Sequence, residues 1–164
     1  MTLFFRKDKY MSLNISFEDG VKEYTINNDS KRVLKFNPKD IGIIDRLEKA
    51  SKDLEAEMNK LTNVDINFDG TSVQKETAEI IRHANAALRK AFDGIFYSGA
   101  SNIVFGKQNP MSIVNGKTLY ESVMESIIAE IKPAMEEQSK EIQILNKNVS
   151  KVESYKAKYE ELRK

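Results

Sequence analysis

Apolar residues recur every three or four positions along the last third of the chain, and this pattern constrains the fold more than any other feature. The spacing alternates between three and four from Ile128 to Tyr159, with Gln138 and Lys156 as polar interruptions. A heptad pattern of this kind predicts a long helix with one apolar seam. We predict that the seam binds a protein partner through Ile128, Ile131, Met135, Ile142, Leu145, Val149 and Val152.

A single helix cannot bury such a seam by itself, so residues 128–164 either fold back on their own domain or pair with another chain. We favour another chain, because this segment is highly charged and poor in aromatic residues. Pro133 lies off the seam and is expected to kink the helix.

The preceding residues, 11–127, predict an α+β domain that is mainly α, with a small N-terminal antiparallel sheet packed on helices. Leu13, Ile15 and Phe17 alternate with polar residues and would pair with Val21, Tyr24 and Ile26 across an Asp19-Gly20 turn. Residues 32–36 would add a third strand. A sheet this small needs one face against helices to be stable.

Three helices are expected after the sheet. Asn37 would cap the first, with Pro38 at its first position and its end near Leu61. The capping-box pattern of residues 71–74 would open the second, which runs from about 72 to 96.

Gly99 would close that second helix in the left-handed conformation, before a short helical turn and a returning loop. Thr118 and Glu121 form another capping box, which opens the long C-terminal helix. Phe92, Phe96 and Phe105 are expected in the core.

One segment fits a calcium-binding loop. Asp65, Asn67, Asp69 and Glu76 would supply oxygen ligands, with Gly70 at the sharp turn. We favour a structural interpretation, in which residues 64–68 form a buried extended segment, because no second loop of this kind exists to pair with it. An unchanged melting temperature on adding calcium would exclude the calcium site.

Catalytic patterns are missing from the sequence. Gly116-Lys117-Thr118 is similar to the end of a phosphate-binding loop, but Met111 stands where the first glycine is needed. His83 is the only histidine, and no nucleophile or carboxylate is spaced to work with it. We therefore expect a protein that is not an enzyme and needs no cofactor.

The composition limits the kinds of partner that the protein is expected to bind. Lys and Arg number 26 against 25 Asp and Glu, so no net field attracts a nucleic acid. Cysteine is absent, and no apolar run is long enough for a membrane span, which favours a cytoplasmic protein. Residues 1–10 are either a disordered N-terminal extension or a non-native segment upstream of a true start at Met11.

The order of elements resembles the small tail assembly chaperones of long-tailed phages and prophages of Gram-positive bacteria. The resemblance covers roughly residues 11 to 135. It is carried by residues 36–40 (FNPKD) leading into 44–47 (IDRL), by 92–99 (FDGIFYSG), and by 104–106 (VFG) with Asn109-Pro110.

This resemblance implies a protein made in the host cytoplasm that coats the tape measure protein, recruits tail tube subunits and is absent from the finished virion. The family often makes a longer product by frameshifting, which a protein sequence does not reveal. Two other interpretations stay open. One is a structural tail or connector component that self-assembles as a homo-oligomer through its C-terminal coiled coil, and the other is a calcium-responsive binding protein.

Overall fold

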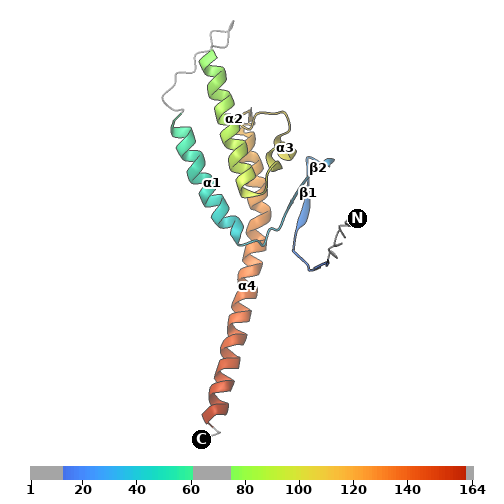
Figure 1. Ribbon diagram of the computed structural model, residues 1–164, viewed down its shortest axis with the longest axis vertical. Coiled ribbons are helices and arrows are strands. Elements are labelled where there is room, and N and C mark those ends of the chain that lie inside the picture. Colours follow the sequence, from blue (N-terminus) through green and yellow to red (C-terminus); the bar gives the residue numbers. More distant parts are fainter. Residues whose placement is uncertain (1–12, 61–74, 162–164) are drawn as a thin grey trace, which may run out of the picture.

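The computed structural model describes residues 13–60 and 75–161 and has the expected α+β, mainly α, fold. Helices α1 (Gly42–Asn59), α2 (Lys75–Ile95) and the first part of α4 (Leu119–Glu161) lie together on one side of the body. The hairpin of β1 (Lys22–Ile26) and β2 (Asp29–Phe36) lies on the other side with the short α3 (Ala100–Phe105). Helix α4 continues far beyond this body toward the C-terminus (Figure 1).

The N-terminal sheet differs from the prediction. Its two strands are joined at Asn27-Asn28, where both residues have positive φ, the geometry of a two-residue hairpin turn. The predicted turn at Asp19-Gly20 and the strand at 13–17 were wrong, since this sheet contains only β1 and β2. Pairing β1 with β2 buries Leu34 and Phe36 against the helices, so the core selects this partner.

The first helix begins later than predicted. Residues 37–40 form a turn closed by the Asp40 amide donating to the Asn37 carbonyl at 3.1 Å. Asn37 Oδ1 accepts from the amide of Lys39 inside that turn, so Asn37 caps the turn and not the helix. Pro38 is fully buried there, and α1 starts at Gly42.

The remaining boundaries are close to expectation where they can be compared. Gly99 has the predicted left-handed conformation, with φ +89°, but α2 already ends at Ile95, and Gly99 is the N-cap of α3 and does not close α2. A small ribbon of β3 (Ile113–Val114) and β4 (Lys117–Thr118) precedes α4 and was not expected. The capping box predicted at residues 71–74 lies outside the described residues.

A chain of aromatic rings runs through the core. Tyr24 stacks on Phe36, Phe36 contacts Phe96, and Phe96 contacts Phe92 at centroid distances of 4.6, 5.2 and 4.8 Å. Phe92 is fully buried and also meets Phe105 and Tyr120, the latter from the first turn of α4. These contacts confirm Phe92, Phe96 and Phe105 as core residues and fix the start of α4 to the body.

Three arginines donate hydrogen bonds to backbone carbonyls at the ends of α2 and α3 and in the turn after α3. Arg46 donates from Nε to the Ile95 carbonyl at 2.7 Å, at the C-terminus of α2. Arg32 donates to the carbonyls of Ile103 and Val104 at the end of α3. Arg89 donates from Nη2 to two further carbonyls in the turn after α3, at 2.8 Å each. Helix ends leave carbonyls without internal partners, and these guanidinium groups supply the donors.

We predict that Arg46→Met lowers the free energy of unfolding by about 1–3 kcal/mol, because the Ile95 carbonyl and Asp40 Oδ2 lose the donors that Arg46 supplies. Chemical denaturation measures the change. Arg46→Lys keeps the charge but not the planar fork and should recover only part of the loss. Equal stability of all three proteins would contradict this role.

The same variant should change the acid response. The hydrogen bond from Arg46 holds the pKa of Asp40 below its usual value. A lowered pKa stabilises the fold above the pKa of the unfolded chain, and that contribution is lost as pH falls through the folded pKa. Between about pH 5 and pH 2 the stability of Arg46→Met should therefore fall less steeply than that of the wild type.

Candidate partner-binding surface

The apolar face of α4 divides into a covered part and an open part. Toward the start of the helix, Met124, Ile127 and Ile131 are buried in the core, and Met135 packs against it. Ile131 is only 6% exposed. The body therefore covers Ile131, which was wrongly expected to be open to a partner, and covers Met135 in part.

The predicted seam residues farther along the helix are open. Ile142, Leu145, Val149 and Val152 are 41%, 61%, 56% and 56% exposed, and we call these four residues the free seam. Ile128 is also exposed, although it lies beside the body. Heptad spacing alone does not distinguish these two situations, because it records only which face of the helix is apolar.

A pair of salt bridges marks where the body ends. Lys39, in the turn before α1, contacts Glu137 at 3.0 Å and Glu141 at 3.3 Å. Hydrogen bonds to these two carboxylates raise the pKa of Lys39 above its usual value. We call the helix from Ile142 to Glu161 the tail, and it extends about 30 Å from the body.

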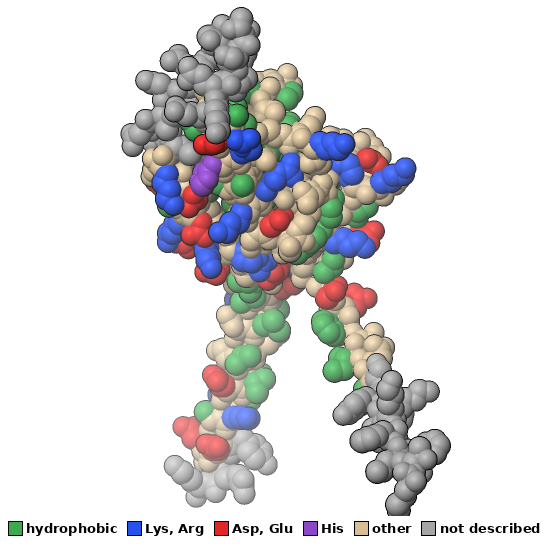
Figure 2. Space-filling view, turned by 45° about the horizontal axis from the view of Figure 1, so that its top comes forward, with side chains coloured by type: hydrophobic (Ala, Val, Ile, Leu, Met, Phe, Trp, Pro, Cys, Tyr) green, Lys and Arg blue, Asp and Glu red, His purple; other side chains and the backbone are tan. Residues whose placement is uncertain are grey.

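Side chains of different chemistry follow separate faces of the tail. Ile144 and Tyr155 are further exposed apolar residues outside the a and d positions, and Ile144 lies on the same face as Lys151. Four lysines follow the opposite face at helical spacing, namely Lys140, Lys147, Lys151 and Lys158. The tail is thus an amphipathic helix with one apolar face open to solvent (Figure 2).

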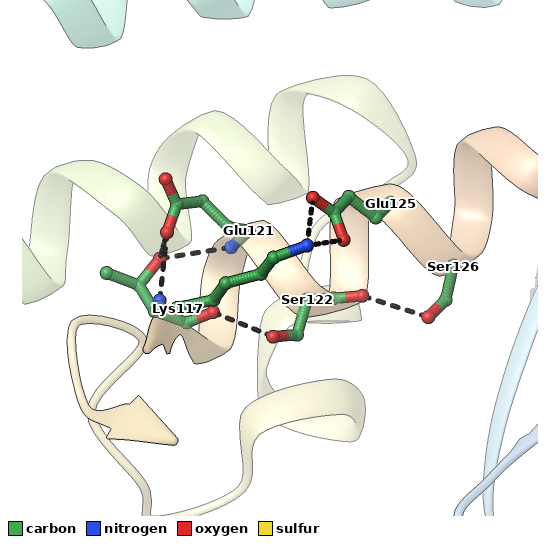
Figure 3. Close-up of polar contacts among 6 residues, drawn as sticks. Lys117, Glu121, Ser122, Glu125 and Ser126 are labelled. Atoms are coloured by element: carbon green, nitrogen blue, oxygen red, sulfur yellow. Dashed lines mark hydrogen bonds and ion pairs between the residues drawn. The ribbon is translucent and has the colours of Figure 1, made fainter. Parts of the chain in front are cut away.

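Helix α4 itself begins with the predicted capping box (Figure 3). The Glu121 amide donates to Thr118 Oγ1 at 3.1 Å, and Glu121 Oε2 accepts from the Thr118 amide at 2.8 Å. These bonds lower the pKa of Glu121. Lys117 is bound by both carboxylate oxygens of Glu125, so the residues that resemble a phosphate loop serve to start a helix.

Other features of the described chain are weaker candidates. A groove of about 840 Å³ lies between α1 and α2 and is lined by alanines and charged residues. At one end of α1, His83 Nε2 lies 2.9 Å from Glu57 Oε2. Hydrogen bonds from Lys60 and His83 lower the pKa of Glu57, so His83 serves as a surface hydrogen-bond partner of α1.

Within residues 13–60 and 75–161, no three acidic, histidine or cysteine side chains gather as metal ligands, and no helix is long and apolar enough to cross a bilayer. The calcium prediction is not tested, because Asp65, Asn67 and Asp69 and the side chain of Glu76 lie outside what the structure describes.

The fold and this surface define a mainly helical α+β protein with a protruding amphipathic helix. A family model matches residues 28–164, and the chain belongs to that family, DUF6673, a family of unknown function. The match includes the whole tail as well as β2 and the helices of the body. No curated protein and no solved structure matches the chain significantly.

Proposed function

We propose that this protein is a non-enzymatic tail assembly chaperone that acts in the bacterial host cytoplasm and holds the phage tape measure protein through its tail. The observation that carries the proposal is the free seam, an apolar stripe open to water on a helix that leaves its own body. An exposed stripe of this kind is a typical site for an amphipathic partner helix. The resemblance of residues 11–135 supplies the identity of the client.

The size of the free seam fits a partner that must later be released. Covering four half-exposed aliphatic side chains contributes about 3–6 kcal/mol of hydrophobic binding free energy. If the client buries an equal area, the total is about 6–12 kcal/mol. Association costs about 4–15 kcal/mol in lost freedom. One tail would therefore bind weakly, and stable coating would need several copies along a long helical client, which tube subunits then displace.

Co-expression with the tape measure protein tests this proposal. The wild-type chain should give a soluble complex, and Leu145→Asp with Val149→Asp should reduce its yield at least about tenfold, because two carboxylates cannot be buried in an apolar seam. A matched control, Gln143→Asp with Ser150→Asp, places the same charges on the other side of the tail and should keep the complex. Undiminished complex with the seam variant would exclude the tail as the client site.

A second candidate is a structural tail or connector component that self-assembles. The seam gives it specific support, since Ile142 and Val149 occupy a positions and Leu145 a d position, the arrangement that favours two-stranded coiled coils. This candidate predicts stable self-assembly without any complex in co-expression, and retention of the protein in purified particles. A chaperone would be absent from those particles.

A further inference from the structure

The segment before β1 is extended and unpaired. Leu13, Ile15 and Phe17 alternate with polar residues and are 85%, 85% and 78% exposed. We call residues 13–19 the arm. It leaves the body on the side of the hairpin, with its hydrophobic side chains in solvent (Figure 2). Alternating apolar residues are typical of a strand with one buried face, so the arm has the pattern of a strand without a sheet.

The base of the arm is held in a defined way. Asn37 Nδ2 donates to the Asp19 carbonyl at 2.9 Å, and Asp19 Oδ1 accepts from the Val21 amide at 3.0 Å. Gly20 between them has φ +71°, and a Cβ there would lie 2.9 Å from Asn37 Nδ2. These contacts fix the bend at Gly20 in a form that does not return the arm along its own β1.

The hairpin has a free edge beside this bend. In the described sheet β1 pairs with β2 alone, so its other edge has no strand partner. Tyr24 and Ile26 are half-buried against the core, whereas Glu23 and Thr25 on the other face are exposed. Unpaired strand edges are sites where another strand adds.

We propose that the arm of one copy adds to β1 of a second copy as its third strand. The antiparallel register that places Phe17, Ile15 and Leu13 opposite Lys22, Tyr24 and Ile26 of the second copy puts every apolar arm residue on the core side. Asn14 and Ser16 then lie opposite Thr25 and Glu23 on the outer face.

Charge supports the same register. Asp19 lies diagonally across from Lys22 of the second copy and on the same face, within reach of that long side chain. Residues 13–17 carry no charge, so the paired segment adds no repulsion against Lys22 or Glu23. The residue pattern would favour the same strand pairing within a single chain. Because the fixed bend keeps the arm away from its own β1, we place this pairing between two copies, as a strand exchange.

Disulfide trapping tests this pairing directly, because the chain has no cysteine of its own. The background carries Leu145→Asp and Val149→Asp, so that association through the tail cannot contribute. Asn14→Cys and Thr25→Cys are made in separate proteins, mixed and oxidised. We expect a cross-linked dimer on a non-reducing gel. Asn14→Cys mixed with Ser51→Cys, whose residue is exposed on α1, is the control and should give at least about tenfold less dimer.

The doubly substituted chain, Asn14→Cys with Thr25→Cys, separates the remaining outcomes. A disulfide within one chain at low concentration would overturn the proposal, because the arm would then complete its own sheet. Light scattering gives an independent measure, in which Ile15→Asp should raise the dissociation constant of the dimer about tenfold or more. The proposal would also be overturned if the chain with the wild-type arm stays monomeric at high concentration and the mixed cysteine variants give no cross-linked dimer. This proposal does not depend on what the tail binds.

Discussion

The structure depends on one helix whose apolar face runs far beyond the part that the body covers. Met124, Ile127 and Ile131 complete the core, and the same face continues into Ile142 and Leu145 with nothing described above it. Helix α4 continues through Pro133 to Glu161, so the tail extends away from the body and does not fold back on it. Exposure of the free seam therefore follows directly from how the core is built.

The body provides a fixed base for this helix. Tyr120 meets Phe92 and Phe105 at the start of α4, and Lys39 contacts Glu137 and Glu141 at the point where the body ends. Buried aromatic contacts supply most of the stabilisation, whereas the exposed salt bridges contribute little to stability and chiefly set direction. A tail with a fixed direction loses less freedom when it binds, which favours a partner helix laid along it.

Local signals in the sequence were sufficient for several elements. The capping box of Thr118 and Glu121, the left-handed Gly99 and the aromatic core near Phe92 depend on neighbouring residues or on simple burial, and all three were predicted. The sheet was predicted in part: the strands that became β1 and β2 were expected, but Asp19-Gly20 is also a good turn sequence, and a further strand at residues 13–17 was wrongly added.

Features that depend on distant residues could not be predicted. Arg46 and Arg32 bind carbonyls 49 and 71 positions away in the sequence, and nothing near either arginine indicates this. The candidate partner-binding surface was predicted only in part, for the same reason. Heptad spacing identified the free seam but also included Ile131 and Met135, because the covering side chains come from elsewhere in the chain.

Hydrogen exchange along α4, with and without the tape measure protein, tests most directly whether the tail is an open helix that a partner covers. In the free protein, amides from Ile142 onward should exchange much faster than those near Ile127, where the body protects the helix. Addition of the client should slow exchange in the tail and leave the core amides unchanged. Unchanged exchange in the tail, with new protection elsewhere on the body, would contradict the account.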